Sequence, residues 1–434
     1  MSSFPSAPVP RAPDEPGNRP RRGLPLLLSN AFDASGRQGA DLALDVLAVT
    51  ILGATAAQMG LLNALGTLAF LVLGIPIGVL VDRSPTTRLI LSAGLTRAGL
   101  LSTVVLAGLL DALSLPHLYV VAALAGTAGV VTETAQTAVA PRAVGTDTVA
   151  SLVARLQSAE SVIGLVVPAA AGALVAVLGA GPTLGLSTAF IALGAVIVLK
   201  LTVFPPVQMH QTDQDSRDEA ATPARAFRRF FGEAREGWTT LREIRPLWRT
   251  TWGVMAINLG LASYSAIEVV LILRVLDLGP AVFGALVTAG ALGGLTGSLV
   301  AVPSGTRLGV PAVLRASVLM LCPVAALTLV ALADPGRAVL WLGAGTFLWG
   351  VVMVTYNVLL AGLAAELTPG ALMGRVSATR RALSMGVVPL GSIGGGLLAD
   401  QAGSAPAVIA WVALNAVGAV LILTALSRPR AAEH

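Results

Sequence analysis

Between two long apolar runs, residues 78–88 read GVLVDRSPTTR. A glycine precedes a carboxylate and two arginines (Asp82, Arg83 and Arg88), and Pro85 lies between the arginines. A helix needs about 20 consecutive apolar residues to cross a bilayer, and the runs on both sides of this stretch reach that length. The stretch therefore predicts a short charged turn at a membrane surface that joins two spanning helices.

Apolar runs of this kind recur along the whole 434-residue chain. The sequence is 55% hydrophobic and 12% charged, whereas soluble domains carry about 25% charged residues. Most of the molecular surface is therefore expected to face hydrocarbon, which predicts an all-helical polytopic membrane protein. Twelve spanning helices are expected near residues 27–52, 58–81, 89–110, 117–139, 151–178, 183–204, 250–274, 281–303, 311–333, 338–365, 379–400 and 405–426.

These helices are expected to form two six-helix halves, residues 25–204 and 249–427. A tail at residues 1–24 is rich in proline and arginine and is expected to be disordered in the cytoplasm, and a second cytoplasmic tail follows at 428–434. Residues 205–248 form the longest polar stretch between the halves. Its basic and aromatic residues favour an amphipathic segment at the lipid headgroups, and a solvated linker is the alternative.

The distribution of arginine predicts the orientation in the membrane. With the N-terminus inside, the loops outside hold little beyond Arg337. Because cytoplasmic loops carry an excess of positive charge, both termini are expected in the cytoplasm and the chain in a bacterial inner membrane. The arginines form no continuous stripe, which argues against a nucleic-acid partner. Outside residues 205–248, the inside segments contain Arg11, Arg19, Arg21, Arg22, Arg83, Arg88, Arg142, Arg307, Arg375, Arg380, Arg381, Arg428 and Arg430.

Several classes of function find no support in the sequence. Cys322 is the only cysteine, so neither an internal disulfide nor a cysteine-based zinc site is expected. The three histidines are scattered, and the sequence contains no phosphate-binding Gly-Lys-Ser/Thr loop. We therefore expect no enzymatic activity, no metal and no cofactor. Energy for any transport would come from an ion gradient or from the substrate itself.

A short repeat supports the division into two halves. Residues 166–168 and 387–389 both read Val-Val-Pro, and they follow turns that carry Arg155 and Arg375. Duplicated halves with a substrate site between them are a common plan among secondary transporters. The prolines and the small residues after them are also explained by helix kinks and close packing, and both interpretations can hold together.

The charged turn resembles the signature loop of the major facilitator superfamily, most closely at Gly78, Leu80, Asp82, Arg83 and Arg88. The resemblance implies twelve helices in two pseudo-symmetric halves. It also implies a conformational latch made of Gly78, Asp82, Arg83 and Arg88. In such a latch, Gly78 would let its helix approach a neighbour closely, and Asp82 would pair with the arginines. Without the resemblance, an ordinary charged turn would explain these residues.

The resemblance covers nearly the whole chain and is closest to the drug-efflux-like branch that includes macrolide and siderophore exporters. It implies proton-coupled export of a small amphiphilic molecule by alternating access. The Gly-Pro motif that antiporters of this superfamily often carry in the fifth helix is reduced here to residues 167–168 and 171–172. The supporting stretches are residues 134–141, 154–157, 374–376 and 389–396.

The first helix contains four ionisable residues at intervals of four: Asp33, Arg37, Asp41 and Asp45. This spacing predicts that they follow one helical face. Asp33 and Arg37 could pair near the inner surface, whereas Asp41 and Asp45 fall nearer the midplane with no basic residue beyond them. Two carboxylates repel each other in a medium of low dielectric constant, so one is expected to hold a proton or to bind a cation. The alternative is a wet vestibule in which both stay ionised.

The resemblance also implies a central cavity lined mainly by the first, fourth, seventh and tenth helices. Arg97 lies deep in the third helix and is expected to pair with Asp41, Asp45 or Glu133. Together with Asp41 and Asp45, Glu133 and Glu268 would make the cavity acidic and suited to protons or cationic substrates. The other residues expected to line this cavity are Asp33, Arg37, Gln136, Asn258, Tyr264, Tyr356 and Asn357.

Three hypotheses for function follow from the sequence. The first is export of a small amphiphile coupled to protons, with the lipid bilayer, a small-molecule substrate and protons as partners. The second is uptake or facilitated passage of a polar metabolite. The third is a non-transporting membrane scaffold or sensor, which would be favoured by a large soluble domain that the sequence lacks. A monomer is the default that the resemblance implies.

Overall fold

A computed structural model describes residues 24–144, 149–201, 235–368 and 372–426 of the chain. Every regular element within these residues is helical. Long helices suit the apolar sequence because a helix satisfies its backbone N–H and C=O groups internally, which hydrocarbon cannot do. The expected N-terminal tail and most of the expected linker lie outside the described residues.

The helices fall into two sets that match the two expected halves. In the first half they are α2 (Leu24–Thr50), α3 (Ala56–Arg83), α4 (Thr86–Leu109), α5 (Leu115–Val144), α6 (Val149–Leu178), α7 (Ala180–Ile197) and the short η2 (Val198–Leu201). In the second half they are α10 (Arg245–Val270), the π-helical turn η3 (Leu271–Val275), α11 (Pro280–Leu308), α12 (Val310–Ala333), the short η4 (Pro335–Arg337), α13 (Ala338–Leu367), α14 (Met373–Gly386), α15 (Val388–Ala402) and α16 (Ser404–Leu426).

Eleven helical segments among the described residues are long and apolar enough to cross a membrane, and α14 with α15 counts as one of them. The remaining long helix, α2, has 27 residues, which is enough to span about 30 Å of hydrocarbon. It is less apolar because it carries the four ionisable residues described above. The predicted all-helical fold with six spans in each half is confirmed.

The charged turn at residues 78–88 forms where the sequence predicts it. Helix α3 ends at Arg83, and α4 begins at Thr86 after the N-cap residue Pro85. The fixed φ angle of proline suits the start of a helix, where its missing N–H is not needed. Arg88 is exposed in the first turns of α4. The side chains of Asp82 and Arg83 lie outside what the structure describes.

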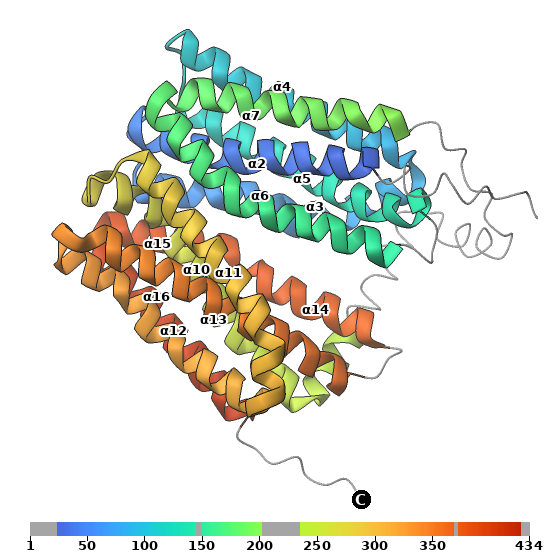
Figure 1. The fold of residues 1–434 in the computed structure, drawn as a ribbon, viewed down its shortest axis with the longest axis vertical. Coiled ribbons are helices and arrows are strands. Elements are labelled where there is room, and N and C mark those ends of the chain that lie inside the picture. Colours follow the sequence, from blue (N-terminus) through green and yellow to red (C-terminus); the bar gives the residue numbers. More distant parts are fainter. Residues whose placement is uncertain (1–23, 145–148, 202–234, 369–371, 427–434) are drawn as a thin grey trace, which may run out of the picture.

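The two halves lie side by side, the first coloured blue to green and the second yellow to red in Figure 1. The most extensive contacts between them are made by two helix pairs: α6 packs against α11, and α3 packs against α15. In each pair the fifth helix of one half meets the second helix of the other. The Val-Val-Pro repeat lies on the two fifth helices, α6 and α15, so the sequence repeat and the packing have the same symmetry.

Glycines bring the backbones of these helix pairs into direct contact. A Cβ atom added to Gly284 of α11 would lie 2.4 Å from the carbonyl oxygen of Pro168 in α6. In the other pair, a Cβ atom on Gly60 of α3 would lie 2.2 Å from the carbonyl oxygen of Ser392 in α15. Such small residues let membrane helices approach closely and gain packing energy along the backbone.

Polar contacts close the molecule at the end opposite the start of α2. Arg274 in η3 donates to the carbonyl oxygens of Val49 at 2.6 Å and Ala54 at 3.0 Å, and so holds the turn between α2 and α3. The backbone N–H of Ala56, at the start of α3, donates to the Asp400 carboxylate at 3.0 Å. A carboxylate at a helix N-terminus is favourable because unpaired N–H groups point toward it. Both contacts join the two halves.

At the other end, where α2 begins (dark blue), the halves diverge in Figure 1. Gly78 lies toward this end of α3, and a Cβ atom there would meet no described residue within 4 Å. The described residues therefore provide no close helix approach at Gly78, and the latch built on it stays a prediction. Among the described residues, the close approaches of α3 lie nearer the closed end, at Gly60 and opposite Gly126 of α5.

We expect Gly284→Ala to destabilise the protein, because the new methyl group would collide with the Pro168 backbone. Overpacking of this kind costs about 1–3 kcal/mol, and thermal unfolding of the purified protein in detergent would show a lower Tm. Gly362→Ala in α13 is a matched control, since its Cβ atom would meet nothing within 4 Å and alanine favours a helix. Equal Tm shifts in the two variants would contradict a tight crossing at Gly284.

Candidate functional site

A cavity of about 660 Å³ lies between the two halves. The first half contributes walls from α2, α3, α4 and α5, and the second half from α10, α11, α14 and α15. Much of the wall is apolar, with Leu44, Leu62 and Phe283 among its residues. The polar and charged residues of the wall are Arg37, Asp41, Asp45, Asn63, Thr67, Arg97, Glu133, Ser265, Glu268, Arg381 and Ser392.

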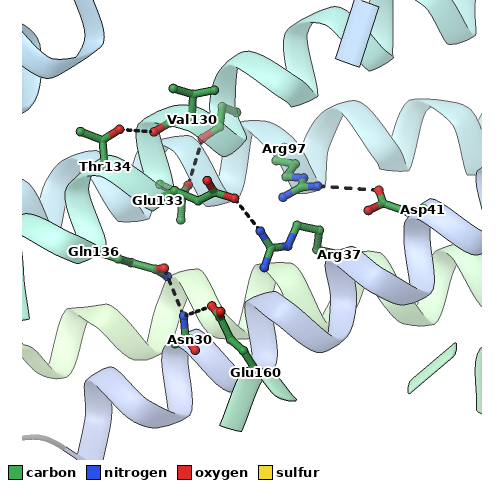
Figure 2. A network of polar contacts seen from close by, with 11 residues as sticks. Asn30, Arg37, Asp41, Arg97, Val130, Glu133, Thr134, Gln136 and Glu160 are labelled. Atoms are coloured by element: carbon green, nitrogen blue, oxygen red, sulfur yellow. Dashed lines mark hydrogen bonds and ion pairs between the residues drawn. The ribbon is translucent and has the colours of Figure 1, made fainter. Parts of the chain in front are cut away.

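Two of the four acidic residues in the cavity are paired with arginine (Figure 2). The Arg37 guanidinium of α2 donates to the Glu133 carboxylate of α5 at 2.7 Å. The guanidinium of Arg97 in α4 lies 4.0 Å from the Asp41 carboxylate of α2. Arg97 is 9% exposed, so its charge is held inside the first half. These pairs join three helices of the first half around the cavity.

The other two acids, Asp45 of α2 and Glu268 of α10, line the same cavity from opposite halves. Neither forms a hydrogen bond or an ion pair within the described part of the chain. The charged groups near enough to act on Asp45 are the carboxylates of Asp41 and Glu268. Asp45 lies one helical turn beyond Asp41 toward the closed end of the molecule. The closed end of the cavity therefore holds two carboxylates, Asp45 and Glu268, that pair with no basic side chain among the described residues.

Asp33 was expected on the same face of α2, but it does not line the cavity. It is buried, and its backbone lies beside Gly194 of α7. Steps of four residues advance about 40° around a helix of 3.6 residues per turn, so Asp33 and Asp45 point about 120° apart. The expected pairing of Asp33 with Arg37 gives way to the bond between Arg37 and Glu133. Arg97 and Arg37 lie close enough to act on the Asp33 charge.

A second polar cluster lies about two turns nearer the start of α2 (Figure 2). The side-chain amide of Asn30 donates to Gln136 of α5 and to Glu160 of α6, both at 3.2 Å. Gln136 was expected in the cavity and instead belongs to this cluster. The cluster joins α2, α5 and α6, so Asn30 and Gln136 help to hold the first half together.

The remaining residues expected to line the cavity lie elsewhere in the second half. Tyr264 is buried and stacks on Trp411 of α16, with ring centroids 4.0 Å apart. Asn258 donates from its side chain to the carbonyl oxygen of Ser384 at 3.0 Å, in the last turn of α14, where a helix leaves carbonyls unpaired. Tyr356 of α13 is buried, with 1% of its surface exposed. The next residue, Asn357, is exposed but does not line the cavity.

Arg381 is a cavity residue that the sequence does not reveal. Hydropathy starts the eleventh span near residue 379, and Arg380 and Arg381 at its start are assigned to the cytoplasmic side. In the structure α14 begins six residues earlier, at Met373, and Arg381 reaches the cavity wall. Asn63 and Thr67 of α3 and Ser265 of α10 also line the cavity. Their spacing on otherwise apolar helices is the only signal that could have indicated them.

The geometry defines a class of protein. Two pseudo-symmetric bundles of spanning helices meet at one end and enclose between them a cavity that carries charges of both signs. Ionisable residues at such depth mark substrate and ion pathways, and a site between two repeats is the plan of secondary transporters. Among the described residues, no group of three or more His, Cys, Asp and Glu side chains could hold a metal ion.

The chain belongs to the major facilitator superfamily, because residues 26–378 match the profile of that family. It is therefore a membrane transporter of this kind. No curated protein sequence matches the chain.

Solved structures of transporters share the fold at low sequence identity. A bacterial homologue of the iron transporter ferroportin, in an inward-facing state, has a TM-score of 0.72 at 15% identity, and the match covers 94% of this chain and 99% of that one. A variant of the nucleoside transporter NupG has a TM-score of 0.69 at 13% identity, covering 94% and 100%. A bacterial homologue of the lysosomal transporter Spinster, inward-facing and unoccupied, has 0.68 at 15%, covering 95% and 98%. These matches show the fold and leave the substrate open.

The bond between Arg37 and Glu133 makes a testable contribution to stability. Arg37→Gln and Glu133→Gln break the same bond, so their effects on unfolding free energy should not add. A partly exposed pair of this kind should show a coupling of about 0.5–1 kcal/mol in a double-mutant cycle. Unfolding in detergent would measure it. Arg37→Gln combined with Asp277→Asn, in an exposed turn, is the control that should be additive. Full additivity of the first pair would contradict the bond.

Proposed function

We propose that this transporter exports a small cationic amphiphile in exchange for protons, by alternating access in a bacterial inner membrane. The observation that carries the proposal is the pair Asp45 and Glu268. These two acids face one cavity from the two halves, and the described part of the chain provides neither with a basic partner. The likeness of residues 134–141, 154–157, 374–376 and 389–396 to the drug-efflux-like branch of the superfamily supports the direction of transport.

The unpaired acids supply a means of coupling. Two carboxylates in a confined, weakly polar space cannot both stay ionised at low cost. The cost is relieved either by protons or by a cationic substrate, so the two compete for one site. Because Asp45 and Glu268 belong to different halves, a rocking motion of the halves would alter their distance and their exposure. Protons would then enter from one side of the membrane and the cation would leave to that side.

The rest of the cavity suits an amphiphilic molecule. Its volume of about 660 Å³ lies within the range of about 300–1,000 Å³ that holds small organic ligands. The wall beside the acids is apolar and would cover the hydrophobic part of a substrate while the carboxylates hold its charge. The apolar side chains of this wall include Leu44, Leu62, Leu101, Leu118, Val121, Val269 and Phe283.

A second candidate, passage of a polar metabolite, is favoured by the arginines of the cavity. Arg37, Arg97 and Arg381 line the same space as the acids, so a zwitterionic or anionic substrate would also find partners there. The fold shared with the nucleoside transporter NupG is compatible with this candidate. Uptake of such a metabolite would not require the carboxylates of Asp45 and Glu268, whereas export of a cation would.

Substitution of either unpaired acid tests the first candidate. A contact with a charged group is worth about 1.5–3 kcal/mol, so Asp45→Asn and Glu268→Gln should each slow ethidium efflux by about ten- to hundredfold. Efflux would be measured in energised cells that contain equal amounts of protein in the membrane. An uncoupler should abolish efflux by the unmodified protein.

The matched control is Asp277→Asn. Asp277 is exposed in the turn before α11 and has a φ angle of 52°, a conformation that asparagine accepts as readily as aspartate. Its efflux rate should equal that of the unmodified protein. Unchanged efflux in both Asp45→Asn and Glu268→Gln would contradict the proposed role of the pair. Efflux that survives the uncoupler would contradict proton coupling, and accumulation of a polar metabolite without ethidium efflux would favour the second candidate.

We propose further that the open end of the cavity faces the cytoplasm. Most described arginines near helix ends lie at this open end, among them Arg88, Arg245, Arg307 and Arg375, whereas Arg337 lies at the closed end. The excess of positive charge on cytoplasmic surfaces supports this orientation.

Reporter fusions to the C-terminus would test this orientation. A green fluorescent protein fused after His434 should fluoresce, because it folds in the cytoplasm. An alkaline phosphatase fused at the same place should be inactive, because it requires the periplasm. Phosphatase activity without fluorescence would reverse the orientation.

A further inference from the structure

A second polar site lies on the outside of the second half, away from the central cavity. A helical segment at residues 235–243 precedes α10 and packs against α14. Glu236 and Arg375 form an ion pair between the two elements. The side chain of Leu241 is fully buried, together with Leu247 of α10. The segment is therefore fixed against the open end of the second half.

A groove of about 410 Å³ lies where this segment meets α10 and α16. None of its residues lines the central cavity. Three arginines and two tryptophans make up most of the wall. The residues of this groove are Arg242, Arg245, Trp248, Arg249, Trp252 and Leu421.

The tryptophans place the groove at the surface of the membrane. Trp238, Trp248 and Trp252 form a ladder of edge-to-face contacts, with centroids 5.0 Å and then 5.6 Å apart. Trp252 is 43% exposed on the outer surface of α10. Tryptophan is enriched at the level of the lipid headgroups, where its ring is apolar and its N–H is polar. Leu421, near the end of α16, extends the apolar side of the groove.

The arginines of the groove carry positive charge that no ion pair within the described part of the chain neutralises. Arg242 and Arg245 form no ion pair within the described residues. The Arg249 guanidinium donates to the carbonyl oxygen of Thr424 at 3.5 Å, which leaves its other N–H groups available. Glu243, the neighbouring carboxylate, is not part of the groove wall. Guanidinium groups bind phosphate oxygens through several N–H donors at once.

We propose that this groove binds the phosphate headgroup of an anionic phospholipid. The guanidinium groups of Arg242, Arg245 and Arg249 surround the phosphodiester, and the acyl chains lie along Trp252 and Leu421. The apolar side of the groove favours a lipid over free phosphate, because free phosphate would leave Trp252 and Leu421 without a partner. Basic pockets between membrane helices bind anionic headgroups in this way.

Native mass spectrometry of the purified full-length protein would test the proposal. The protein is incubated with equal amounts of phosphatidylglycerol and phosphatidylcholine, and the retained lipids are counted. The unmodified protein should retain phosphatidylglycerol preferentially. The triple variant Arg242→Gln, Arg245→Gln and Arg249→Gln should retain at least about tenfold less of it, since each arginine near the membrane surface attracts anionic lipid.

The triple variant Arg307→Gln, Arg315→Gln and Arg337→Gln is the control, because it removes the same charge outside the groove. It should keep the preference for phosphatidylglycerol. Equal retention of the two lipids by the unmodified protein would overturn the proposal, whether or not the groove variant folds. Unchanged retention by the groove variant would also overturn it. Displacement of the lipid by excess inorganic phosphate as effectively as by added phosphatidylglycerol would identify a free-phosphate site and overturn the lipid assignment.

Discussion

The structure depends on how the charges of α2 are accommodated inside a membrane. An ionisable side chain at bilayer depth costs at least about 2.5–3.5 kcal/mol unless it is paired or hydrated. Arg37 and Asp41 meet this demand by pairing with Glu133 of α5 and Arg97 of α4, which fixes α2 among its neighbours. Asp45 has no such partner among the described residues, and it lies against the cavity. The need to compensate these charges therefore determines both the packing of the first half and the position of the cavity.

The closed end of the cavity is held by contacts of a different kind. Backbones cross at Gly60 and Gly284 with almost no side chain between them, and Arg274 and Asp400 join the halves by hydrogen bonds. Close backbone packing is short-ranged and resists sliding, whereas a few hydrogen bonds to exposed turns can be exchanged for water. A motion that opens this end would break the contacts of Arg274 and Asp400 first and leave the crossings as pivots. Such rocking of rigid halves is the usual motion of transporters built from repeats.

The spans, the two halves and the unusual charges of α2 could be predicted because they are encoded in one-dimensional patterns of polarity. The residues that reach the cavity could not all be predicted, because that depends on how each helix is rotated against its neighbours. Tyr264 and Glu268 are four residues apart on α10, yet Glu268 lines the cavity and Tyr264 stacks on Trp411 behind it. Arg381 was assigned to the cytoplasmic side because it lies at the start of the expected span, whereas α14 begins six residues earlier, at Met373.

The position of the unpaired acids on different halves has a mechanistic consequence. If both lay on α2, a rigid-body motion would leave their separation unchanged, and the repulsion between them would be the same in every state. With Asp45 on α2 and Glu268 on α10, their repulsion varies with the angle between the halves. In the proposed mechanism, a proton or a cation that binds between them would remove this repulsion and so favour the states in which they are close. Occupancy and conformation would thereby be linked, since a ligand shifts a conformational equilibrium only through different affinity for its states.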